Sequence, residues 1–227
     1  MRKAPSVILW AVAFAFVESA AVEYLCAIYY PLQKGGFNFP ILTLEQLEAM
    51  GHEHVTRLTI ELGREFATLV MLAAIAATAA SNRREAWAHF MIAFGVWDIF
   101  YYLWLKLFID WPPALTTWDL LFLIPVPWVA PVLAPLIISV TLVACGLTVL
   151  FYEARQRPLV TRWLDWILIV LGGCIVVVSF CEDYRNIVSG QLPNPFNWGL
   201  FSAGLCLSAA AFLLVLFRQR RVKERPC

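Results

Sequence analysis

The chain has 227 residues, 61% of them hydrophobic, and a formal net charge of +1. Soluble proteins average about half apolar residues, so this composition indicates an integral membrane protein. The near-zero net charge gives no reason to expect a nucleic-acid partner. Three histidines exclude a His-rich di-metal centre, and the cysteines form no CxxC pair. At this length a single domain over residues 1–227 is expected.

The first predicted element is a membrane helix within residues 1–30. Arg2 and Lys3 precede an apolar run that continues to Tyr29 and Tyr30. A basic start followed by an apolar core also fits a cleaved signal peptide. The run is nevertheless long enough to span a bilayer. We therefore expect a retained first helix, with Glu18 near its middle.

Two further helices are predicted after a loop over Gln33–Gly51. The second covers about Val55–Thr78 and ends at the polar residues Asn82, Arg83 and Arg84. The third covers about Trp87–Ile109, and the prolines after Trp111 end it.

The apolar run Leu120–Tyr152 is too long for one crossing, and prolines crowd its first half. Residues before proline avoid helical geometry. We therefore expect a short broken or re-entrant segment over Leu120–Trp128 and a fourth helix from near Val129. Non-helical backbone at membrane depth is tolerated where it is buried by protein or lines a cavity, so this segment is a candidate cavity wall. The last two helices are predicted over Trp163–Cys181 and Trp198–Phe217.

The predicted fold is thus an all-α integral membrane protein with a bundle of about six transmembrane helices. Basic residues gather in alternate loops, while acidic residues dominate the others. The positive-inside rule then places both termini in the cytoplasm. We expect a multi-pass protein of a bacterial inner membrane that contacts membrane lipids.

Ionisable residues interrupt the first three helices. Glu18, Glu65 and Asp98 fall near the middle of successive helices, and Glu61 lies one turn from Glu65. Helical periodicity puts His54, Glu61 and Glu65 on one face. Ionisable residues inside a bilayer are costly and are usually functional. The sequence therefore predicts a buried polar site that opens toward the periplasmic side.

The charge of this site suggests a bound cation. With Glu23 included, its five carboxyl groups exceed the nearby cations Arg57, Arg64 and Lys106 by two. Isolated charge is expensive in such a medium, so either some carboxyl groups are protonated or a divalent cation is bound. The predicted ligands of an Fe, Mn or Zn ion are Glu18, Glu61, Glu65, Asp98 and, optionally, His54.

The leading functional hypothesis is a metal-dependent membrane enzyme, a hydrolase or oxidoreductase, that acts on a lipid or another apolar substrate. Its catalytic candidates are Glu65, Asp98 and Arg64, of which Arg64 steadies the carboxylates or holds an anionic group of the substrate. One alternative is a proton- or cation-coupled transporter with carboxylates at the midplane. Another is a small structural subunit of a membrane complex, in which an ion-pair network holds the helices together and pairs at i,i+3 and i,i+4 spacing, such as Glu61–Arg64, neutralise each other. The partners considered besides membrane lipids are a second copy of the chain in a homo-oligomer, which would favour the transporter, and another subunit of a membrane complex.

Overall fold

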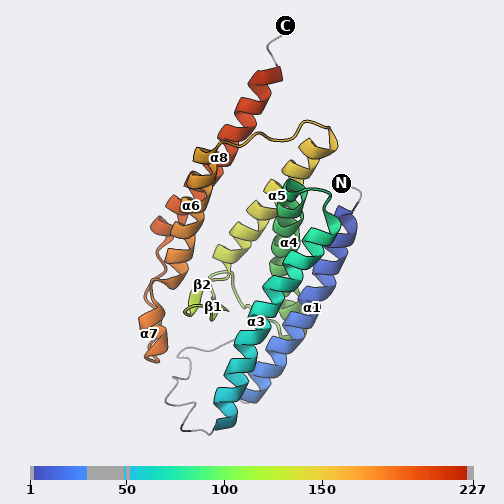
Figure 1. Ribbon diagram of the computed structural model, residues 1–227. Helices are drawn as coiled ribbons and strands as arrows, with labels where there is room; N and C mark the ends of the chain where they lie inside the picture. Colours follow the sequence, from blue (N-terminus) through green and yellow to red (C-terminus); the bar gives the residue numbers. More distant parts are fainter. Residues whose placement is uncertain (1–2, 30–48, 50–51, 224–227) are drawn as a thin grey trace.

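The structure is a computed structural model that describes residues 3–29, 49 and 52–223 (Figure 1). The elements in chain order are α1 (Ala4–Tyr29), α3 (His52–Ala79), α4 (Arg83–Ile109), β1 (Trp118–Phe122), β2 (Trp128–Pro131), α5 (Leu133–Ala154), α6 (Trp163–Cys181), α7 (Tyr184–Val188) and α8 (Trp198–Lys223). Within the described residues, six helices are long and apolar enough to cross a membrane. The prediction of a mostly helical multi-pass membrane protein is confirmed at this level. The predicted loop over Gln33–Gly51 lies almost wholly outside the described residues.

The long helices run alternately up and down, so α1 begins at the end of the molecule where α8 finishes (Figure 1). We call this the basic end, because Arg83, Arg84, Arg155 and Arg162 lie at or beside the helix termini there. The opposite end carries the two strands and α7, and we call it the hairpin end.

Local sequence signals explain where α4 begins and ends. The Asn82 side chain caps its first turn, accepting hydrogen bonds from the backbone N–H groups of Arg84 at 2.9 Å and Glu85 at 3.0 Å. Such a cap satisfies donors that the helix itself cannot pair. The helix therefore starts four residues before the predicted Trp87. It ends at Ile109, as predicted, where Asp110 takes a left-handed conformation with φ 56°.

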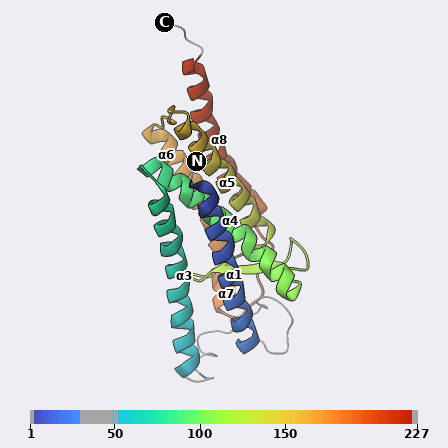
Figure 2. The same cartoon turned by 90° about the vertical axis from the view of Figure 1, so that its right-hand side faces the viewer.

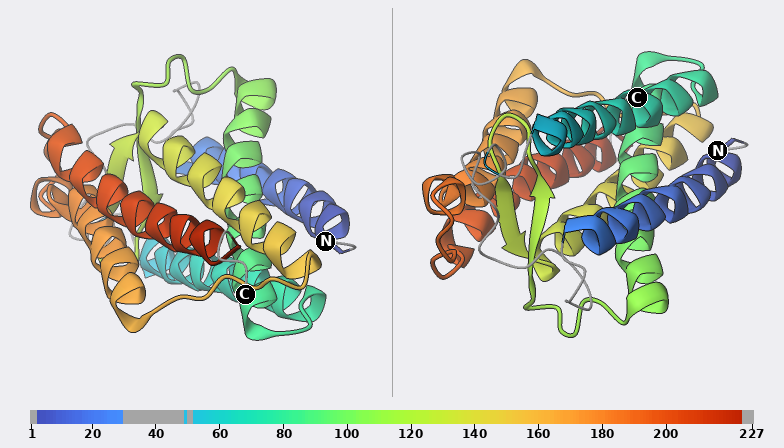
Figure 3. Two further views of the ribbon diagram at one scale, coloured as in Figure 1. Left: turned by 90° about the horizontal axis from the view of Figure 1, so that it is seen from above. Right: turned by 90° about the horizontal axis from the view of Figure 1, so that it is seen from below.

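The proline-rich segment before α5 forms a β-hairpin. β1 and β2 are antiparallel, with Trp118 opposite Pro131 and Leu120 opposite Val129. The expectation that α5 begins near Val129 is wrong, because Val129 and Ala130 belong to β2 and the helix starts at Leu133. A two-stranded sheet is marginal alone, so this hairpin depends on its packing. In Figures 1 and 3 it lies between the α6–α8 pair and the other long helices.

Glycines set the closest helix contacts. In α4, a Cβ added at Gly95 would lie 2.5 Å from the carbonyl oxygen of Ser139 in α5. Likewise a Cβ at Gly172 of α6 would lie 2.6 Å from the carbonyl oxygen of Gly204 in α8. Small residues let membrane helices approach in this way.

The helices form two groups. α4 packs on α1, α3 and α5, and in Figure 2 it runs diagonally across α1. α6 packs on α8, and this pair meets the first group mainly through β2 and an apolar cluster at the hairpin end. That cluster includes Ala130, Ala134, Val176, Phe180 and Phe201.

Candidate functional site

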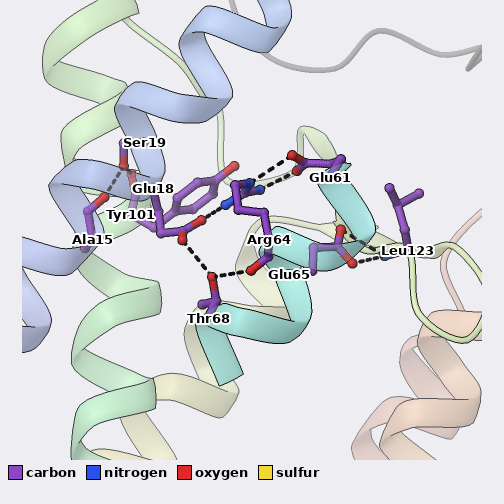
Figure 4. A network of polar contacts seen from close by, with 9 residues as sticks. All are labelled: Ala15, Glu18, Ser19, Glu61, Arg64, Glu65, Thr68, Tyr101 and Leu123. Carbon is purple, nitrogen blue, oxygen red and sulfur yellow. Dashed lines mark hydrogen bonds and ion pairs between the residues drawn. The ribbon is translucent and has the colours of Figure 1, made fainter. Parts of the chain in front are cut away.

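Arg64 connects α1 and α3 near the hairpin end (Figure 4). Its guanidinium forms ion pairs with Glu18 of α1 and with Glu61 one turn earlier in α3. The Thr68 hydroxyl donates a second hydrogen bond to Glu18, at 2.7 Å. Glu18 is 5% exposed, so its charge is compensated inside the protein rather than by water. The predicted i,i+3 pairing of Glu61 with Arg64 is present, and Arg64 is placed to steady two carboxylates.

Glu65 lies one residue after Arg64 but points in a different direction (Figure 4). Both of its carboxylate oxygens accept from the backbone N–H of Leu123, at 2.9 and 3.2 Å. Leu123 follows β1, so this side chain joins α3 to the turn of the hairpin. Within the described residues no lysine or arginine forms an ion pair with Glu65.

Asp98 of α4 is held by a hydroxyl group. The Ser139 hydroxyl of α5 donates to its Oδ2 at 2.7 Å. Ser139 is itself 1% exposed, and it lies where Gly95 brings the two helices together. The close approach of α4 and α5 therefore fixes the position of this carboxyl group.

Asp119 is a buried carboxyl group that the sequence analysis missed. It lies in β1 and is 1% exposed. The Tyr102 hydroxyl donates to its Oδ2 at 2.8 Å, and the Leu120 N–H donates to its Oδ1 at 2.9 Å. Burial raises the pKa of the Asp119 carboxyl to about 7, and the nearby Asp98 adds to the rise, whereas the two hydrogen bonds oppose it.

A cavity of about 780 Å³ brings these groups together. Its polar lining at the hairpin end includes Glu18, Glu61, Arg64, Glu65, Thr68, Asp98, Tyr101, Tyr102 and Asp119. From there its wall follows α4 from Tyr102 back to Arg83, which is roughly 28 Å of helix. That length is close to the hydrocarbon thickness of a bilayer, about 30 Å. The hairpin lines the cavity too, as expected of the proline-rich segment.

An aromatic stripe forms the α4 wall of the cavity. Its rings follow one another at i,i+3 and i,i+4 spacing, with centroids 5.5 to 6.3 Å apart, and they are those of Trp87, Phe90, Phe94, Trp97 and Tyr101. Apolar side chains of the α6–α8 pair, such as Ile169, Val177 and Phe212, line the cavity as well. Most of its length is therefore apolar, and the acidic groups lie at one end. Volumes of this size are typical of ligand pockets.

The predicted metal site is not found as a ligand set. Within the described residues no group of three or more His, Cys, Asp or Glu side chains could hold a metal ion. The reason is local: Glu18, Glu65 and Asp98 each turn to a different partner. The His54 and Arg57 side chains lie outside the described structure. Lys106 is not part of the network, because its Nζ pairs with Asp110 at 2.6 Å at the end of α4.

No protein-family model, curated protein or solved structure matches this chain.

Proposed function

We propose that this protein is a membrane enzyme that binds an amphiphilic lipid in its cavity and acts on it at the hairpin end. The single observation behind this proposal is the cavity itself, which is apolar along most of a membrane-spanning length and acidic at one end. A lipid chain matches the aromatic stripe in length and polarity. The polar part of the lipid, where the reaction takes place, would lie beside the carboxyl groups at the hairpin end.

Glu65 and Asp98 are the proposed proton-transfer groups. Both line the cavity, and each is held by a neutral donor, the Leu123 N–H or the Ser139 hydroxyl. A positioned carboxyl group of this kind can act as general acid or base. One of the pair removes a proton from the substrate and the other returns one. Arg64 is a positioning residue, since its guanidinium is engaged by Glu18 and Glu61.

A divalent Fe, Mn or Zn ion remains part of the proposal as a cofactor to be tested. Elemental analysis of the detergent-purified protein, beside Glu65→Gln and Asp98→Asn, tests it directly. A stoichiometric metal that both substitutions remove would support a metal enzyme. If the protein is metal-free but active, the reaction must proceed by acid–base chemistry of the carboxyl groups without a metal ion.

The proposal places the basic end in the cytoplasm and the hairpin end toward the periplasm of a bacterial inner membrane. Arginines at the basic end, among them Arg155, Arg157 and Arg162, support this orientation by the positive-inside rule. Single-cysteine labelling at each end of the chain in intact cells tests it.

The cavity is tested by filling it. Gly173 of α6 lines the cavity, and a Cβ added there would meet nothing within 4 Å. Gly173→Leu should therefore occupy the lipid path without disturbing helix packing. Gly63 of α3 also faces open space but does not line the cavity, so Gly63→Leu is the matched control.

The readout is the lipid that stays bound after detergent purification, identified and quantified by native mass spectrometry. Wild type and Gly63→Leu should retain it, and Gly173→Leu should lose it. Glu65→Gln should retain the lipid but not convert it. Equal lipid content in the two leucine variants would refute the proposal.

One observation favours a second candidate, the proton- or cation-coupled transporter. The lining of one cavity extends from Arg83 at the basic end to Glu61 at the hairpin end, as the transport route of a carrier would. Reconstitution in liposomes with an internal pH indicator separates the two candidates. A proton flux that depends on Glu65 supports transport, whereas lipid turnover without flux supports the enzyme.

A further inference from the structure

The two ends of the cavity carry opposite charge. At the hairpin end five carboxyl groups line the cavity beside a single described cation, Arg64, which is already paired with two of them. At the basic end the charged lining residues are Arg83 and Arg84. The cavity is thus apolar along most of its length, with arginines at one end and carboxyl groups at the other.

Arg83 and Arg84 differ from the other basic residues at that end. Lys3 donates to the Thr78 carbonyl oxygen, Arg155 lies over the Phe151 ring, and Arg218 pairs with Asp165. None of these three lines the cavity. A general preference for positive charge at a membrane surface would not explain why, of these residues, only this adjacent pair lines the cavity.

The arginine pair retains donors for a ligand. The Arg84 Nη1 atom lies 3.6 Å from Glu153 Oε1, which is longer than a hydrogen bond. For Arg83 the described residues provide no ion-pair partner within 4.0 Å. Guanidinium groups bind phosphate oxygens in a bidentate fashion, and this geometry is specific to arginine.

We propose that the cavity selects an anionic, phosphate-bearing lipid, with its head group on Arg83 and Arg84 and its chain along the aromatic stripe toward Glu65 and Asp98. The inference rests on the proposed function, and it adds the class of lipid that is bound and the direction in which the lipid lies in the cavity. The reverse orientation would bring the phosphate against five carboxyl groups. Because the head group is held roughly 28 Å of helix away from Tyr102, the part of the substrate that reacts is an uncharged polar group at the far end of its chain.

The test compares lipids that share the same acyl chains and differ in head group. The wild-type protein, stripped of lipid in detergent, is offered phosphatidylglycerol, phosphatidylcholine and diacylglycerol, and the bound fraction of each is measured by native mass spectrometry. The wild type should prefer phosphatidylglycerol by about tenfold, the size of effect expected for charge-assisted hydrogen bonds. Arg83→Gln/Arg84→Gln should lose this preference but bind diacylglycerol as before.

Two control variants separate a specific head-group site from a general effect of surface charge. Arg155→Gln/Arg157→Gln removes the same charge at the same end but outside the cavity, and it should keep the preference. Gly173→Leu should abolish binding of all three lipids, because it blocks the chain. If both arginine double variants lose the preference equally, the selectivity is a general surface effect and the inference is overturned.

The inference and the proposed function fail in different ways. A wild type that binds all three lipids equally, with Gly173→Leu still abolishing binding, would refute the head-group assignment and leave the lipid cavity standing. Binding that Gly173→Leu does not change would refute the cavity as the lipid site, and both proposals would fall together. Free inorganic phosphate should not compete with the lipid, since the chain supplies most of the contact. Competition by phosphate alone would overturn the assignment to a lipid.

Discussion

The contact between α6 and α8 predicts opposite effects for two neighbouring glycine substitutions. Gly172→Ala would place a methyl group 2.6 Å from the Gly204 carbonyl oxygen and 2.8 Å from the Ser208 backbone nitrogen. Both are backbone atoms, so the helices themselves must separate. Overpacking of this kind costs about 1–3 kcal/mol. At Gly173 an added methyl group meets nothing within 4 Å, and alanine should gain up to about 1 kcal/mol of helix propensity.

The free energies of unfolding of the two variants should therefore differ by about 1–4 kcal/mol. Titration of detergent-solubilised protein with sodium dodecyl sulfate, followed by the fluorescence of its 10 tryptophans, measures this difference. Gly204→Ala should resemble Gly172→Ala, because its Cβ would lie 2.6 Å from the Gly172 carbonyl oxygen. Equal midpoints for Gly172→Ala and Gly173→Ala would refute the close packing of α6 on α8.

Three further predictions concern the buried polar groups. Arg64→Gln leaves Glu18 buried without its cation and should lower the free energy of unfolding by about 3–5 kcal/mol in the same titration. Adding Glu18→Gln to this variant removes the unpaired charge and should restore most of the lost stability. Asp119→Asn should flatten the pH dependence of stability: the folded state holds the proton up to about pH 7 and the unfolded state releases it near 3.8, so wild-type stability falls as pH rises between these values. Parallel curves of melting temperature against pH for wild type and Asp119→Asn would contradict this assignment. Glu65→Gln should remain as stable as wild type, because its amide oxygen can still accept from the hairpin N–H, yet it should not turn over bound lipid; an active variant would remove Glu65 from the site.

Helix placement followed from the sequence where the apolar pattern was uninterrupted. α6 was predicted over Trp163–Cys181 and has those bounds, because an apolar run is flanked by the polar residues Arg162 and Glu182. The prolines before α5 correctly excluded a helix over Leu120–Trp128. The prolines did not indicate that the segment folds into a hairpin of two paired strands. The register of β1 on β2 depends on how β2 packs against Phe180 and Phe201.

The sequence indicated how deep along their helices the residues of the candidate site lie, but it did not indicate which partners their side chains contact. Glu18, Glu65 and Asp98 all line the cavity, as their mid-helix positions suggested. Periodicity fixed the faces of single helices, but it could not show that Glu65 turns to the hairpin while Arg64 reaches α1. Asp119 could not be assigned to the site from the sequence, because its partner Tyr102 lies 17 residues earlier in another element. The signal for it was a single acidic residue within the otherwise apolar strand sequence WDLLF.

The division of the helices into two groups has a consequence for biogenesis. The first group, made of α1, α3, α4, the hairpin and α5, is complete in the chain before α6 is synthesised, and N-terminal domains generally fold first during synthesis. If folding follows the order of synthesis, α6 and α8 pair with each other and then dock through the apolar cluster at the hairpin end. The cavity has no second wall until this final docking step. Under the proposed function, a lipid that lay against the aromatic stripe of the newly inserted first group would then be enclosed from the bilayer as the protein matures.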